Sequence, residues 1–199
     1  TLQYFSKRKD LQLLIRVHPA EVSGSTKSRQ LVVDEIKKLF PSLPENIFII
    51  PPESNIGTYS AMQKCNATII YGTKTGVELT SMGIPVIVAG EAWIRNKGLS
   101  IDVSSENEYY DVLDKLPLED DHMTSEQIRL ARQYAYHFFL RRMIEVSSVT
   151  PSEGKAPFVL GISCLRDLAP GIDKGLDVIC DGILHNEPFI FRKELSEET

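Results

Sequence analysis

The stretch that most constrains the fold is residues 67–90, which read ATIIYGTKTGVELTSMGIPVIVAG. Two short runs of β-branched and apolar residues, 67–71 and 85–89, flank a segment that starts with GTKTG and continues as VELTSM. Gly83 stands where a helix commonly ends in a left-handed residue. We therefore expect a strand, a helix over residues 77–82 and a second, parallel strand, joined by a right-handed crossover.

The same alternation of strand and helix continues on both sides of this unit. Strands are expected at residues 11–17, 46–50, 67–71, 85–89 and 99–103, and helices at residues 28–40, 58–65, 77–82, 104–116 and 124–146. Thr58 and Ser105 are candidate N-caps. Strands that alternate with helices predict an α/β fold, here a Rossmann-like doubly wound parallel sheet.

Length and composition fit one such domain with an extension. The chain has 199 residues, of which 42% are apolar and 25% charged, as in ordinary globular proteins. We expect the Rossmann-like domain over residues 1–146. Residues 147–199 are expected to form a loop-rich extension with a short helix at 175–184, which can cross back to a missing N-terminal domain. The opening TLQYFSKRKD has no initiator Met and resembles the end of a helix, so we expect a chain cut from a longer one.

Several function classes are disfavoured by what the sequence lacks. A formal net charge of −5 argues against a nucleic-acid partner. The sequence lacks the motifs of dinucleotide-binding proteins (GxGxxG), P-loop NTPases (GxxxxGK[ST]), α/β-hydrolases (GxSxG) and zinc proteases (HExxH). The three cysteines are too far apart to form a metal-ligand pattern. We therefore expect no metal and no cofactor, free thiols and a cytoplasmic location. No apolar run approaches the roughly 20 residues of a membrane span.

Polar turns follow the first three expected strands, and these turns supply the candidate site. The carboxyl ends of parallel strands meet at one edge of a sheet, where ligands of open α/β folds bind. The turns carry hydroxyls, an imidazole, an amine and backbone N–H groups, all of which suit a phosphate. The candidate residues are His18, Ser54, Asn55, Thr73, Lys74, Thr75, Gly76 and Glu78.

Each candidate also has a structural interpretation. His18 can donate to a phosphate or a leaving nucleotide, or it can be a histidine satisfied by the backbone. The turn at residues 72–76 can bind phosphate or only cap its helix. Glu78 can hold a ribose diol or interact with the helix dipole. Ser54 and Asn55 can reach a base or ribose, or form an ordinary turn.

Two arginines and an aromatic stripe also have both a ligand-binding and a structural interpretation. Arg16 and Arg95 are candidate phosphate partners, although a solvated or salt-bridged arginine is the simpler interpretation. The aromatic residues between 134 and 139 are expected to pack on the sheet or on a missing domain, and we assign them no ligand.

Three motifs together carry a family resemblance. They are RVHPAE, then IIPPESNIGTYSAMQKCNATIIYGTKTGVELTSMGIPVIVAG, and finally PGIDKGLDVICDGIL. They resemble the C-terminal half of GT-B glycosyltransferases, and in particular the bacterial capsule-polysaccharide biosynthesis proteins that include CMP-Kdo transferases. The resemblance covers mainly residues 11–116. It implies that His18 and the Thr73–Gly76 turn contact the nucleotide phosphate and that Glu78 holds the ribose. Lys74 stands where many members have serine or another small residue.

The resemblance implies the donor-binding half of an inverting, metal-independent glycosyltransferase. Such an enzyme would move a sugar from a nucleotide-sugar donor, with a CMP-sugar favoured, to a glycan or glycolipid acceptor of a surface or capsule polysaccharide. The catalytic role falls to His18 at the leaving phosphate, while the missing N-terminal domain would supply the general base and the acceptor site. The fragment alone is then expected to transfer nothing. Peripheral association with the inner face of the plasma membrane is compatible with this role.

Two other functions stay open. A sugar-nucleotide 2-epimerase shares the fold and a Glu-bearing turn, and it would consume a UDP-sugar without an acceptor. A non-catalytic nucleotide- or carbohydrate-binding subunit of a polysaccharide assembly complex would instead use the aromatic helix at residues 124–146 as a partner surface.

Overall fold

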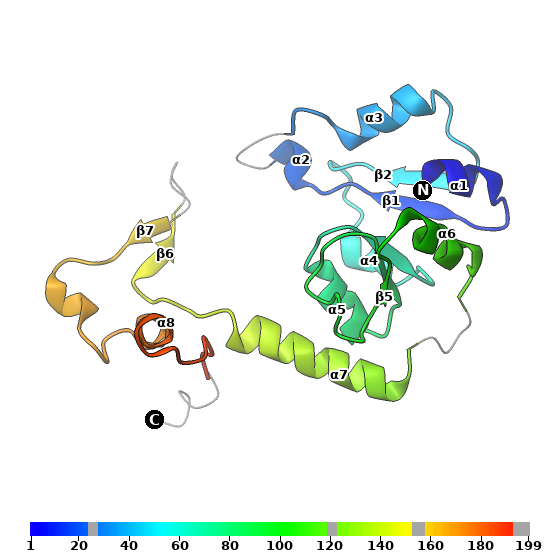
Figure 1. Ribbon diagram of the computed structural model, residues 1–199. Helices are drawn as coiled ribbons and strands as arrows, with labels where there is room; N and C mark the ends of the chain where they lie inside the picture. The colour runs from blue at the N-terminus through cyan, green and yellow to red at the C-terminus, as the bar shows by residue number, and fades with distance from the viewer. Residues whose placement is uncertain (24–27, 119–122, 153–157, 193–199) are drawn as a thin grey trace. The chain divides into compact units, whose positions relative to one another are not determined.

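The computed structural model describes residues 1–23, 28–118, 123–152 and 158–192 (Figure 1). The chain divides into two compact units, Thr1–Thr124 and Ser125–Thr199. The expected domain boundary lay after residue 146, whereas this division assigns the long helix that starts at Ser125 to the second unit.

The first unit alternates helices with parallel strands. Its elements are α1 (Leu2–Lys7), β1 (Leu13–Arg16), α2 (Ala20–Ser23), α3 (Val32–Leu39), β2 (Ile47–Ile50), α4 (Thr58–Met62), β3 (Thr68–Ile70), α5 (Thr75–Ser81), β4 (Val86–Val88), β5 (Ile101–Asp102) and α6 (Glu106–Asp114). β1 pairs with β2, and β3, β4 and β5 pair in that order, always in parallel. The predicted α/β class is thereby confirmed. The strands described form a two-stranded and a three-stranded sheet, and no hydrogen-bonded ladder between β1 and β3 joins them into one doubly wound sheet.

The core of this unit is apolar and links the two sheets. The three residues of β4 are at most 1% exposed, as expected for a parallel strand covered on both faces. Phe5 of α1, Ile47 of β2 and Leu113 of α6 form a buried cluster, and Ile69 of β3 packs against it. The sheets therefore share hydrophobic packing even though no strand pairing connects them.

Local signals in the sequence set several helix ends. Gly83 has φ 81°, so the predicted left-handed residue after α5 is confirmed. Ser105 caps α6, because its Oγ accepts from the N–H of Glu108 at 3.2 Å. The predicted cap at Thr58 is wrong, since Gly57 is the N-cap of α4 and Thr58 is its first helical residue.

The second unit contains α7 (Ser125–Tyr136), the π-helical turn η1 (His137–Arg141), the hairpin of β6 (Val149–Pro151) and β7 (Phe158–Leu160), the 3₁₀ helix η2 (Leu165–Leu168) and α8 (Lys174–His185). α8 confirms the short helix predicted in the C-terminal region. The helix predicted to run to residue 146 is shorter, and an antiparallel hairpin occupies part of the region predicted as loop. Among the residues described in both units, no helix is long and apolar enough to cross a membrane.

Candidate functional site

Arg16 connects the carboxyl ends of the first two strands to α4. Its Nη1 donates to the carbonyl oxygens of Val17 at 2.6 Å and Pro51 at 2.9 Å. Its Nε donates to Oγ1 of Thr58 at 3.3 Å. The guanidinium therefore bonds main-chain carbonyls and a hydroxyl at the strand ends, which matches neither the phosphate ligand nor the solvated arginine considered from sequence.

His18 directly follows this end of β1 and its side chain is exposed. Its Nδ1 accepts a hydrogen bond from the N–H of Ala20 at 3.1 Å. A neutral imidazole that accepts through Nδ1 carries its proton on Nε2, and this hydrogen-bond pattern assigns that tautomer. The Nε2–H is then a donor that a ligand at the rim can use, while the other nitrogen is satisfied by the backbone.

The turn after β2 is held by its own bonds. Oγ of Ser54 accepts from the N–H of Ile56 at 3.2 Å, and the N–H of Ser54 donates to the carbonyl of Pro51 at 3.1 Å. Asn55 is exposed beside it. This arrangement is a hydroxyl-stabilised turn that leaves the Asn55 amide at the surface.

The turn after β3 has exposed polar residues followed by a buried glycine. Oγ1 of Thr73 accepts from the N–H of Thr75 at 3.3 Å and donates to Oγ1 of Thr75 at 3.1 Å, and Lys74 is exposed. Gly76 is buried: a Cβ there would lie 2.7 Å from Cδ1 of Ile70 and 2.9 Å from Cδ1 of Ile94. Gly76 therefore lets α5 pack closely on β3, a structural requirement that the sequence pattern did not reveal.

Tyr59 joins α4 to α5 through a single hydrogen bond. Its hydroxyl donates to Oε2 of Glu78 at 2.9 Å, and this bond raises the pKa of Tyr59. Together with the Arg16–Thr58 bond, it makes a series of contacts from the end of β1 through α4 to α5. The elements that carry the three polar turns are thus tied together at one rim. Sequence reasoning missed Tyr59, because no local pattern indicates a bond across 19 residues.

A cavity of about 660 Å³ lies at the carboxyl ends of β3, β4 and β5. None of the eight candidate residues lines it. Its lining residues are Thr1, Ile69, Ile70, Tyr71, Ala89, Gly90, Glu91, Arg95, Val103, Ser104, Ser105, Glu106 and Tyr109. The rule that ligands bind beyond the carboxyl ends of parallel strands is the signal that could have drawn attention to the segments after β4 and β5.

Arg95 fixes one wall of this cavity. Its guanidinium donates to the carbonyls of Gly90 and Val103, each at 3.0 Å, and to Oγ of Ser104 at 3.2 Å. Its side chain is only 13% exposed, and the carboxylate of Glu91 lies 3.7 Å from Nε. Arg95 therefore holds the carboxyl ends of β4 and β5 in place, mainly through main-chain carbonyls.

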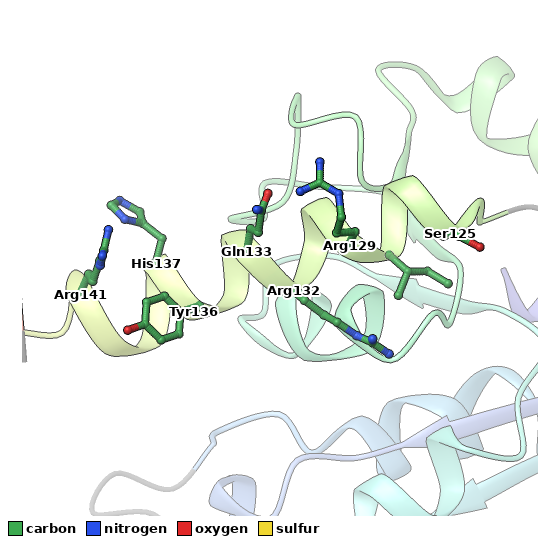
Figure 2. A pocket seen from close by; sticks show the side chains of 8 residues that line it. Ser125, Arg129, Arg132, Gln133, Tyr136, His137 and Arg141 are labelled. Carbon is green, nitrogen blue, oxygen red and sulfur yellow. The ribbon is translucent and has the colours of Figure 1, made fainter. Parts of the chain in front are cut away.

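A second hollow, of about 770 Å³, lies along α7 and η1 in the second unit. Figure 2 shows its labelled side chains on one continuous helical segment, and they include Arg129, Arg132, His137 and Arg141. Arg129 is engaged by both oxygens of Glu126, at 2.6 and 2.7 Å, and the guanidinium of Arg141 lies 5.5 Å from the ring centroid of Tyr136. Both guanidiniums therefore have partners on their own helical segment, and none of the eight residues predicted from the sequence lines this hollow.

The cysteines, and the acidic residues that the structure describes, add no further site. Cys65, Cys164 and Cys180 are free thiols, and burial raises the pKa of Cys65. In the part of the chain that the structure describes, no group of three or more His, Cys, Asp or Glu side chains is placed to hold a metal ion.

No protein-family model, curated protein or solved structure matches this chain.

Proposed function

We propose that the first unit is the donor-binding half of a metal-independent glycosyltransferase, with a nucleotide-sugar bound at the rim formed by the turns after β1, β2 and β3. In this proposal the unit is the Rossmann-like half of a GT-B architecture. The observation that carries the proposal is the series of contacts from Arg16 to Thr58 and from Tyr59 to Glu78, because it ties the elements bearing the three turns together. The motif resemblance supports the same function.

The rim residues have complementary chemical roles. The Nε2–H of His18 donates to the donor phosphate, and the side chains of Thr73, Lys74 and Thr75 offer further donors and a positive charge. Such groups stabilise charge that develops on a leaving phosphate, which is the work that a metal ion does in other transferases. Glu78 bonds Tyr59 through one oxygen, and its other oxygen is an acceptor for a ribose hydroxyl.

The remaining parts of the reaction lie outside this unit. A second domain would supply the general base and the site for the glycan or glycolipid acceptor, and closure of the two domains would exclude water from the donor. The nucleotide-sugar is a substrate, and the mechanism uses no cofactor. A cytoplasmic enzyme, associated peripherally with the inner face of the plasma membrane, fits an acceptor made at that surface.

Calorimetric titration of the chain with CMP, UDP and GDP tests this proposal. We expect CMP to bind best and His18→Ala to weaken it about 10- to 100-fold, as expected when a hydrogen bond to a charged group is lost. His185→Ala is the matched control, because His185 is exposed at the end of α8 in the second unit. Equal affinity of His18→Ala, or no binding at millimolar nucleotide, would contradict the proposal. Selective binding of UDP would contradict the CMP preference and favour a UDP-sugar transferase or the 2-epimerase.

A further inference from the structure

The cavity at the carboxyl ends of β3, β4 and β5 is separate from the polar turns predicted from the sequence, but Tyr71 connects the two. Tyr71 lines the cavity and directly precedes the 72–76 turn. Thr73 follows two residues later, so the Cα atoms of Tyr71 and Thr73 are at most about 7 Å apart. The turn and the cavity are therefore neighbours along the chain, at a separation within the length of a mononucleotide.

Tyr71 presents an exposed ring at the edge of the cavity. The residue is 78% exposed, although it follows a buried strand directly. Its ring lies against Gly90, where an added Cβ would be 2.8 Å from Cγ and from Cδ2 of the ring. A Cβ at Gly72 would likewise be 2.9 Å from the carbonyl oxygen of Glu91. The two glycines let the segments after β3 and β4 approach closely, and Gly90 leaves room for the ring of Tyr71 beside the cavity.

Two acidic residues lie among those that surround the cavity. The carboxylates of Glu91 and Glu106 belong to its lining, and the side chain of Glu91 is 92% exposed. Arg95 and the terminal ammonium group of Thr1 supply the positive charge among the described lining residues, and the N–H groups of Arg95 donate to carbonyls of the strand ends. An uncharged planar group that carries N–H donors fits this environment better than an anion does.

We infer that this cavity receives the nucleobase of the donor, stacked on the ring of Tyr71 with an exocyclic amino group directed to the carboxylate of Glu91. The inference rests on the proposed function, which puts the phosphate on the adjacent 72–76 turn. An ionised carboxylate only accepts hydrogen bonds, and cytosine carries an N4 amino donor where uracil has a carbonyl acceptor. The site is therefore a stacking platform that prefers cytosine to uracil.

The stacking contact is tested by titrating the whole chain with CMP and with ribose 5-phosphate, which has no base. Tyr71→Ala should weaken CMP about 5- to 150-fold, the range expected for one base stacked on an aromatic ring. The affinity for ribose 5-phosphate should not change. Tyr71→Phe keeps the ring and should bind CMP as the unaltered chain does. Phe158→Ala, which removes an aromatic ring that is 51% exposed in the second unit, is the matched control.

The outcomes separate this inference from the proposed function. If the unaltered chain binds CMP and Tyr71→Ala binds it equally well, the base site is wrong and the donor-binding rim stands. If Tyr71→Ala weakens the binding of CMP and of ribose 5-phosphate by the same factor, the ring stabilises the structure of the rim and does not stack on a base. This result also overturns the inference. If the unaltered chain binds neither CMP nor UMP, both proposals fail.

The role of Glu91 has its own test, the ratio of the affinities for CMP and UMP. Glu91→Gln should reduce the preference for CMP several-fold, because an amide presents N–H donors as well as an acceptor oxygen. Glu45→Gln changes an exposed carboxylate that does not line the cavity, and it should leave the ratio unchanged. An unaltered ratio in Glu91→Gln would remove Glu91 from base recognition.

Discussion

The two units of this chain bury different kinds of groups. Nearly all the buried hydrophobic side chains described belong to the first unit, and Leu79, Ile87 and Leu113 are completely covered. In the described part of the second unit, Ala131 is the one buried hydrophobic residue, and large side chains such as Leu165 are up to 87% exposed. The second unit therefore depends much less on an apolar core.

A buried carboxylate organises the second unit instead. Oδ1 of Asp173 accepts from the N–H groups of Gly175 and Leu176 at the start of α8, at 3.0 and 3.1 Å. Oδ2 accepts from the hydroxyl of Ser147 at 3.0 Å and from the N–H of Ser148 at 3.1 Å. These bonds tie α8 to the segment before β6. Burial of apolar area therefore stabilises the first unit, whereas the second unit relies on hydrogen bonds to the ionised carboxylate of Asp173.

The largest expected effect is on the apolar core. Leu113→Ala should lower the free energy of unfolding of the first unit by about 3 kcal/mol, because it leaves a cavity between α1, β2 and α6. Denaturant unfolding followed by the fluorescence of Trp93, the single tryptophan of the chain, reports on this unit. Leu39→Ala, at a position 72% exposed, should change the midpoint little. Equal effects of the two variants would contradict the described core.

A smaller effect is expected from the buried carboxylate. Asp173→Ala should lower the stability of the second unit by about 2 kcal/mol, since it removes a helix cap and leaves buried donors without an acceptor. Hydrogen exchange of the α8 amides measures the loss, and the Trp93 transition should stay unchanged. Asp181→Ala replaces an exposed carboxylate on the same helix and should have little effect. Faster exchange in both variants would show that Asp173 has no special role.

The same network predicts a dependence on acid. Burial raises the pKa of Asp173, but the hydrogen bonds from Leu176, Ser148 and Ser147 outweigh it and lower the pKa from 3.8 to about 2. A lowered pKa means that the contribution to stability is present above pH 3.8 and is lost as the pH falls towards 2. Protection of the α8 amides against hydrogen exchange should decline between pH 3.8 and about 2 in the unaltered chain. Asp173→Ala should show no such decline. An equal decline of protection in the unaltered chain and in Asp173→Ala would show that another group causes the acid dependence.

The smallest predicted change concerns the close approach of the segments after β3 and β4. Gly90→Ala would bring a Cβ within 2.6 Å of the Tyr71 carbonyl oxygen, and the resulting shift should destabilise the first unit by about 1 kcal/mol. Gly161→Ala is the control, because it lies in the second unit and its Cβ would meet only the carbonyl oxygen of Ser148, at an ordinary 3.6 Å. The Trp93 transition distinguishes them, and an unchanged midpoint in Gly90→Ala would show that this contact can relax freely.

Features set by neighbouring residues could be predicted from the sequence. The apolar runs that became β1 to β4, the left-handed Gly83 and the Ser105 cap depend on local chemistry, and they appear where the pattern indicated. The end of α7 could not be predicted in this way. No proline or glycine marks the change to a π-helical turn at His137.

The candidate site was predictable only in outline. The rule about strand ends indicated the three turns, but the bonds of Arg16 to Pro51 and of Tyr59 to Glu78 join residues 35 and 19 positions apart. The cavity beside Tyr71 depends on Gly90, which lies in the segment after β4. Such contacts follow from tertiary packing, and a single sequence carries no periodic signal for them.

Hydrogen exchange of the whole chain with and without CMP shows directly whether a nucleotide binds at the rim of the first unit. We expect slower exchange at the amides of His18, Ala20 and residues 71–76 when CMP is bound, with no change over residues 125–152 and 158–192. Protection confined to α7 and η1, or no protection at saturating CMP, would contradict a donor site at the rim of the first unit.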